Sequence, residues 1–150
     1  MKKEKNNNTF NAKVDIVTFP DNIKYYSQER KDYTELALTA IKQKPNVIKY
    51  ISSSYKNYSI LCKEAINQHY GTFLLINDNV HNYKQLGEKA IMKYPFLVSV
   101  LAKTTKHYYY FWDLAISTCC YKVLMSIDEN KEELFPLVEK VIHQEPLAIF

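Results

Sequence analysis

The side chains that could carry catalytic or metal-binding chemistry in this sequence are three cysteines and four histidines. Cys62, Cys119 and Cys120 do not form the Cys-x-x-Cys pair of zinc and redox sites, and adjacent cysteines rarely bridge one another. None of the histidines has the His-x-x-x-His spacing of a zinc motif: His69, His81, His107 and His143. We therefore predict neither a bound metal nor a cofactor.

Glycine is too scarce for two common kinds of catalytic loop. Only Gly71 and Gly87 are present, whereas phosphate-binding loops and nucleophile elbows need several glycines for their tight backbone turns. No arrangement of paired carboxylates suggests acid–base catalysis. We predict that the protein is not an enzyme, and an enzyme without a recognisable motif remains an alternative.

Aromatic side chains are the unusual feature of the composition. The chain has thirteen tyrosines, seven phenylalanines and one tryptophan. Exposed tyrosine and tryptophan side chains are frequent anchors of protein interfaces. Which of these rings are exposed depends on the elements that carry them.

Those elements belong to a repeat of 25 residues. Four consecutive copies begin at Tyr33, Tyr58, Tyr83 and Tyr108. Three further columns hold one residue type or a close substitute in all four copies: Leu36/Leu61/Leu86/Phe111, Ala40/Ala65/Ala90/Ala115 and Ile41/Ile66/Ile91/Ile116. A fixed period of this length indicates units that stack and bury their apolar faces on one another.

The first half of each copy is predicted to be a short amphipathic helix. Its apolar residues follow the three-and-four spacing of one helix face: Tyr33, Leu36, Ala37, Ala40 and Ile41. Asp32 with Glu35, and Asn82 with Gln85, match a capping box that satisfies free amide groups at a helix start. These helices are therefore expected to begin near residues 33 and 83.

A proline is predicted to open a second helix in the copy. Pro45 and Pro95 occupy the same column, and the first helical position tolerates a residue without an amide hydrogen. The apolar residues after it recur between copies: Val47, Ile48, Tyr50 and Ile51, then Leu97, Val98, Val100 and Leu101. The sequence thus predicts an all-α fold, an α-solenoid of five to six stacked two-helix hairpins with a 25-residue repeat.

The repeat sets the expected domain organisation. We predict a flexible tail over residues 1–9 and a single helical-repeat domain over residues 10–150, with two atypical outer copies as end caps. The six copies lie near residues 10–32, 33–57, 58–82, 83–107, 108–132 and 133–150. The longest apolar runs are far below the roughly 20 residues that a membrane span needs, and no signal-peptide pattern follows the basic N-terminus.

Charge is distributed unevenly along the chain. Residues 1–57 carry 11 basic and 6 acidic side chains, residues 58–107 carry 6 and 3, and residues 108–150 carry 3 and 7. A basic front and an acidic back could steer a charged partner or support contact between copies of the chain. An ordinary solvated surface is the alternative interpretation.

Comparison between copies selects five aromatic residues as candidates for protein binding. Tyr109 and Tyr110 occupy columns that are mainly polar in the other copies, so we expect them to face water. Trp112 stands where other copies have Ala37, Cys62 and Gly87, so its ring either fills a gap or points outward. Tyr70 and Tyr94 fall in the turn between the two helices. A locally thicker core or a dimer contact is the alternative for this group.

Basic side chains with interleaved aromatic rings could also indicate RNA binding, since some helical repeats recognise one base per unit. Such recognition requires polar residues in one column throughout. The candidate column is inconsistent: Gln43, Gln68, Lys93 and Thr118. We predict no nucleic-acid partner.

The repeat resembles a known family. Tyr-x-x-Leu-x-x-x-Ala-Ile from Tyr33, then Pro-x-Val-Ile-x-Tyr-Ile from Pro45 and a polar turn ending in Asn57-Tyr58, resembles the short helical repeats called domain of unknown function 4116. The likeness covers about residues 19–150 and is weakest over 108–132. It implies the stacked-hairpin fold and names no activity. Such repeats occur in translocated effectors of intracellular bacteria, so it also implies a protein that binds host proteins.

We therefore expect a non-enzymatic module that binds another protein, as a bacterial effector or adaptor in a host cell. A glutamate-rich stretch, 128–133, before the apolar end resembles the tails of type IV secretion substrates, although an acidic turn explains it equally well. Expected locations are the cytoplasm, or a host cell reached without a signal peptide. A regulator or inhibitor of a cognate bacterial enzyme is the main alternative, and homo-oligomer formation stays open.

Overall fold

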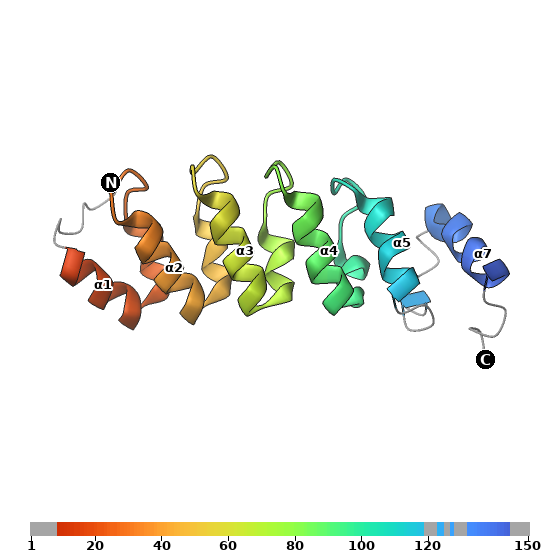
Figure 1. Ribbon diagram of the computed structural model, residues 1–150, viewed down its shortest axis with the longest axis horizontal. Helices are drawn as coiled ribbons and strands as arrows, with labels where there is room; N and C mark the ends of the chain where they lie inside the picture. Colours follow the sequence, from red (N-terminus) through yellow and green to blue (C-terminus); the bar gives the residue numbers. More distant parts are fainter. Residues whose placement is uncertain (1–8, 119–122, 125–126, 128–131, 145–150) are drawn as a thin grey trace. The chain divides into compact units, whose positions relative to one another are not determined.

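The computed structural model describes residues 9–118, 123–124, 127 and 132–144 of the chain. Within these residues all regular structure is helical and no strand occurs (Figure 1). The chain divides into two compact units, unit 1 (residues 1–86) and unit 2 (residues 87–150). The predicted all-α solenoid of stacked two-helix hairpins is confirmed.

The helices recur at the predicted step. Unit 1 contains, in order, α1 (Thr9–Thr18), η1 (Pro20–Tyr25), α2 (Tyr33–Gln43), η2 (Pro45–Tyr50), α3 (Tyr58–Gln68) and η3 (Tyr70–Leu75). The helix α4 (Tyr83–Lys93) begins in unit 1 and ends in unit 2. Unit 2 then contains η4 (Pro95–Val100), α5 (Tyr108–Thr118), η5 (Glu132–Leu134) and α7 (Phe135–Gln144).

The conserved columns of the repeat form the core. All four alanines of the column Ala40/Ala65/Ala90/Ala115 are fully buried, as are the isoleucines at 41, 66 and 91. Within unit 1, α1, α2 and α3 pack side by side as one layer, and η1, η2 and η3 pack as a second layer behind them. Helices of 10 or 11 residues are marginal alone in water, so this stacking supplies most of their stability.

In the four copies whose second helix the structure describes, that helix is a short 3₁₀ helix. The residue before each proline is extended, with φ −141° at Lys44 and at Tyr94, because the proline ring excludes the α region there. The 3₁₀ helix that follows has only six residues. Two residues predicted for the core are therefore not in it, since Tyr50 is half-buried and Val100 is exposed.

The predicted capping boxes are wrong. Asp32 makes no side-chain cap for α2, because its carboxylate is bound by Arg30, whose Nε and Nη2 donate to it at 2.9 and 2.8 Å. The hydrogen bond from Arg30 lowers the pKa of Asp32. Asn82 Oδ1 is buried and accepts no hydrogen bond within the described part of the chain. The helices still begin at Tyr33 and Tyr83, so apolar packing rather than capping fixes their starts.

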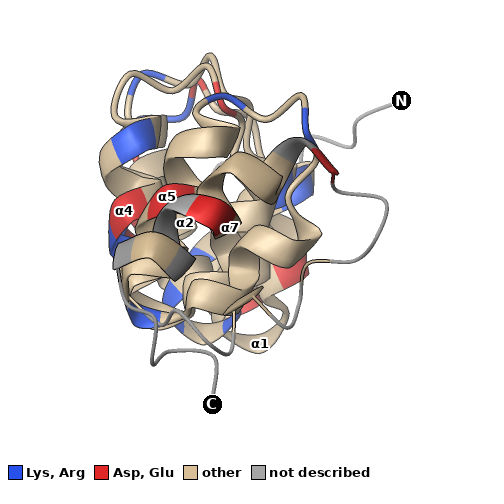
Figure 2. Cartoon of the chain, turned by 90° about the vertical axis from the view of Figure 1, so that its right-hand side faces the viewer, with Lys and Arg blue, Asp and Glu red and all other residues tan. Residues whose placement is uncertain are grey.

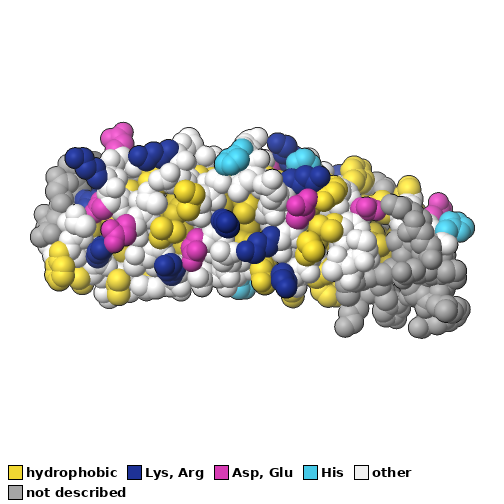
Figure 3. Space-filling view, in the orientation of Figure 1, with side chains coloured by type: hydrophobic (Ala, Val, Ile, Leu, Met, Phe, Trp, Pro, Cys, Tyr) yellow, Lys and Arg dark blue, Asp and Glu magenta, His cyan; other side chains and the backbone are white. Residues whose placement is uncertain are grey.

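The predicted N-terminal cap helix starts at Thr9 and is not polar on its outer side. Ala12 and Ile16 are buried against the rest of unit 1, whereas Phe10, Val14 and Val17 are exposed. Figure 3 shows hydrophobic side chains at the end of the molecule where Figure 1 places α1. Residues 1–8 of the predicted tail lie outside the described residues.

Acidic side chains lie on each α-helix of the described part of unit 2, and Glu132 adds one on η5. Glu88, Asp113 and Glu139 belong to α4, α5 and α7, whose ribbons carry the red segments in Figure 2. None of the helices in the described segments is long and apolar enough to cross a membrane.

Candidate functional site

The five predicted contact residues are divided between the two units. Tyr70 belongs to unit 1, and the other four belong to unit 2. Tyr109 and Tyr110 lie in the first turn of α5, whereas Tyr94 follows the last turn of α4. Both helices run in the same direction (Figure 1), so Tyr94 lies at the opposite end of its repeat from the tyrosine pair.

Tyr109 and Tyr110 are exposed, as the comparison between copies predicted. Their exposed fractions are 50% and 37%, although aromatic rings this large usually bury more of their surface. Tyr108 beside them is in the core column and is buried. The pair therefore adds apolar surface that the packing of α5 does not use.

The tyrosine pair is held in place by its neighbours. The hydroxyl of Tyr110 donates to Glu88 Oε1 at 2.6 Å, which links the first turn of α5 to the preceding α4. This hydrogen bond raises the pKa of the Tyr110 hydroxyl. The ring of Tyr109 meets the ring of Tyr108 edge to face, with centroids 5.4 Å apart. Side chains fixed in this way lose less conformational entropy when a partner binds.

Trp112 is not a surface residue, which corrects its assignment as a contact. Its exposed fraction is 0%, and its ring lies 6.3 Å from that of Tyr108. The same column is buried in the other copies, where Ala37 and Cys62 stand. Because the column faces the interior, the indole fills core space rather than pointing to solvent.

Tyr94 is exposed and lies against the half-buried ring of Phe96, with centroids 6.2 Å apart. It is the residue immediately before Pro95, in the turn where the sequence placed it. Because Tyr94 lies at the opposite end of its repeat from Tyr109 and Tyr110, it would be a separate contact site within unit 2. Its role in binding stays a prediction.

Tyr70 has a structural task in a copy that lacks the proline. It is the first residue of η3, in the column of Pro45 and Pro95, and is half-buried. Here His69 Nδ1 accepts a hydrogen bond from Gly71 N at 3.1 Å and caps the helix. Thr72 Oγ1 donates back to the His69 carbonyl at 2.7 Å. The His69 side chain thus stabilises the start of η3, where η2 and η4 have a proline.

Sequence comparison missed a row of lysine and tyrosine side chains on the 3₁₀ helices of unit 1. Lys24 and Lys49 share one column of the repeat, and Tyr25 and Tyr50 share the next. This repetition was visible in the sequence, but Tyr50 was assigned to the apolar set of the second helix and the lysine column was not considered. In the structure, Lys24, Tyr25 and Lys49 are exposed.

The free thiol of Cys62 is buried in the core. Burial raises the pKa of Cys62 to about 12, which disfavours the reactive thiolate at neutral pH. Cys119 and Cys120 lie outside the described residues. Within the described segments, no three histidine, cysteine, aspartate or glutamate side chains gather as a metal site would require.

Charged side chains are mixed with the exposed apolar ones. On the face seen in Figure 3, hydrophobic side chains form small separate patches among lysine, arginine and acidic side chains.

Comparison with protein-family models, with curated proteins and with solved structures finds no match for this chain. Arguments about function therefore depend on its own surface.

Proposed function

We propose that this chain is a non-enzymatic helical-repeat module that binds another protein, with Tyr109 and Tyr110 among its contacts. The observation that carries the proposal is the exposure of two adjacent tyrosines in columns where other copies hold Thr34, Ser59 and Lys84, or Glu35, Ile60 and Gln85. Folding of the repeat does not need aromatic rings there, since the other copies fold without them.

The physical properties of the pair suit a binding contact. Tyrosine combines a large apolar ring with a hydroxyl and is enriched among the residues that dominate binding energy. The hydrogen bond from Tyr110 to Glu88 holds one ring before a partner arrives. The resemblance to effector repeats adds the proposal that the partner is a host protein.

The test is a variant with Tyr109→Ala and Tyr110→Ala, compared with the wild type in pull-downs from host-cell and producing-cell lysates. A captured protein is then purified and its affinity measured by calorimetry. We expect an affinity loss of about 30-fold or more, the effect of removing a dominant contact of about 2 kcal/mol. The midpoint of thermal unfolding should stay close to that of the wild type.

The matched control is Lys84→Ala with Gln85→Ala, which changes the same two columns in the preceding copy. It should keep full affinity. A partner from the host lysate supports an effector or adaptor, and one from the producing cell supports a regulator of a cognate enzyme. Unchanged affinity in the tyrosine variant, or a large fall in its unfolding temperature, would refute the proposed contacts.

A further inference from the structure

The layer of 3₁₀ helices in unit 1 carries a continuous row of side chains, five of which are exposed and one half-buried. We call this row the η strip, and its members come from three consecutive copies: Lys24, Tyr25, Lys49, Tyr50, Leu74 and Leu75. The helices η1 and η2 contact each other, and so do η2 and η3. The strip therefore crosses three repeats without a break.

Its first two copies are joined by cation–π contacts. Lys24 Nζ lies 4.9 Å from the ring centroid of Tyr25 and 5.4 Å from that of Tyr50 in the next copy. Lys49 Nζ lies 5.0 Å from the same Tyr50 ring. All three distances are within the roughly 6 Å at which an ammonium group is attracted to an aromatic face. The ammonium groups are thus placed over the rings of the strip.

Positive charge along the three 3₁₀ helices exceeds negative charge. Asp21 is the one acidic residue in the sequences of η1, η2 and η3, and its carboxylate pairs with Lys44. That bond lowers the pKa of Asp21, and the charges of Lys24 and Lys49 lower it further. Neither Lys24 nor Lys49 forms an ion pair with a carboxylate of the described residues. Two ammonium groups therefore remain available to an anionic ligand.

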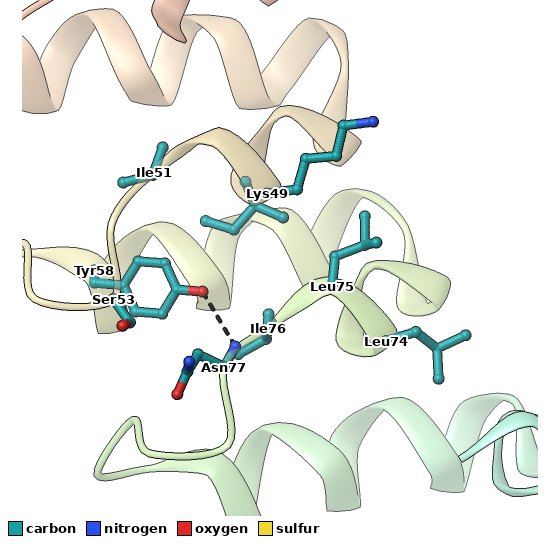
Figure 4. Close-up of a pocket in the computed structure, with 9 residues that line it drawn as sticks. Lys49, Ile51, Ser53, Tyr58, Leu74, Leu75, Ile76 and Asn77 are labelled. Carbon is teal, nitrogen blue, oxygen red and sulfur yellow. Dashed lines mark hydrogen bonds between the residues drawn. The ribbon is translucent and has the colours of Figure 1, made fainter. Parts of the chain in front are cut away.

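The far end of the strip is apolar. Leu74 and Leu75 expose 42% and 38% of their surface at the end of η3. Together with Lys49, Tyr58 and Asn77 they line a groove of about 260 Å³ between the second and third copies (Figure 4). One hydrogen bond joins two of the lining residues, since Asn77 N donates to the Tyr58 hydroxyl at 3.3 Å.

We propose that the η strip binds an extended segment of another protein that contains both acidic side chains and apolar side chains such as leucine. Its carboxylates would meet Lys24 and Lys49, and its apolar side chains would cover Leu74 and Leu75. A single-stranded nucleic acid would also suit lysines and tyrosines, but phosphates gain nothing from the exposed leucine pair. The inference concerns a different surface from Tyr109 and Tyr110 and holds whether or not that pair binds a partner.

The test is selection of a phage-displayed library of random short peptides on the immobilised full chain. We expect the enriched peptides to combine aspartate or glutamate with leucine, isoleucine or phenylalanine. One such peptide is then labelled, and its affinity is measured by fluorescence anisotropy. Lys24→Glu with Lys49→Glu should weaken it at least about tenfold, because two attractive contacts become repulsive. Leu75→Ser should weaken it without changing its salt dependence.

The control is Lys42→Glu with Lys63→Glu, which makes the same charge change on exposed positions of α2 and α3. It should leave the affinity within about twofold. If the charge reversal lowers the unfolding temperature, the neutral variant Lys24→Gln with Lys49→Gln takes its place, with a smaller expected loss. Three results would overturn the proposal. The selection could fail to enrich peptides that combine acidic and apolar residues, or the strip and control variants could lose affinity equally. The chain could also bind an oligothymidine tightly, with that binding lost when Lys24 and Lys49 are replaced.

Discussion

Replacing Trp112 with alanine tests whether the fifth copy depends on a single large ring. The indole is fully buried, in a column where another copy folds with Ala37. In this copy the neighbours have packed around the indole, so Trp112→Ala leaves a cavity. Buried tryptophan-to-alanine changes cost about 3–5 kcal/mol. For a chain of this size that corresponds to a fall of about 6–20 °C in the midpoint of unfolding.

Circular dichroism is the assay, since the variant has no tryptophan to follow by fluorescence. Trp112→Phe keeps a ring and should lose less stability. Tyr109→Ala removes an exposed ring from the same helix and should change stability by no more than about 0.5 kcal/mol. In the wild type, the emission of Trp112 should be shifted to the blue and resist quenching by acrylamide. An unfolding midpoint for Trp112→Ala within 2 °C of the wild type would refute the burial argument.

Three further predictions concern local features of the repeat. Gly71→Ala places a Cβ 2.8 Å from the ring of His69, so it should break the η3 cap and lower the stability measured in thermal melts by about 1 kcal/mol. In a variant that already has His69→Ala, the same change should cost little more, because the cap is already lost; additive losses would contradict this explanation. His107 has φ 64°, a left-handed backbone conformation that asparagine tolerates better than histidine. His107→Asn should therefore raise the free energy of unfolding by about 0.5 kcal/mol, and a lower melting temperature for this variant would contradict backbone strain at His107. Burial raises the pKa of Tyr58 to about 12, above its ordinary value of about 10, so its contribution to folding is complete below pH 10 and is lost as pH rises to 12. The stability deficit of Tyr58→Phe in denaturant titrations should therefore shrink between pH 9 and pH 12, and a constant deficit would contradict the pKa shift.

The period of the sequence was enough to predict the fold. One copy cannot bury its own apolar face, so a regular spacing of Tyr33, Leu36, Ala40 and Ile41 in every copy requires stacked neighbours. The helix starts expected near Tyr33 and Tyr83 are confirmed, although the capping boxes from which they were predicted do not form. The exposure of Tyr109 and Tyr110 also followed from comparing columns, because equivalent positions in a repeat face the same way.

Local capping and helix type could not be predicted in this way. Asp32 has the spacing of a capping residue, yet Arg30 two residues earlier binds its carboxylate more strongly than a backbone amide would. The 3₁₀ form of the second helix limits it to six residues, which leaves Val100 outside the core. Both outcomes depend on competition between nearby partners that a pattern of residue types does not rank.

The sequence by itself determined the all-helical repeat, its step, its core columns and the outward position of Tyr109 and Tyr110, because these depend on periodicity alone. Only the tertiary structure decided that Trp112 is buried, that Tyr94 stands apart from the tyrosine pair, and that Lys24 meets Tyr50 of the next copy. Those facts depend on the distance between neighbouring copies and on the direction of each side chain. Aligning the copies of the repeat by sequence gives neither of these.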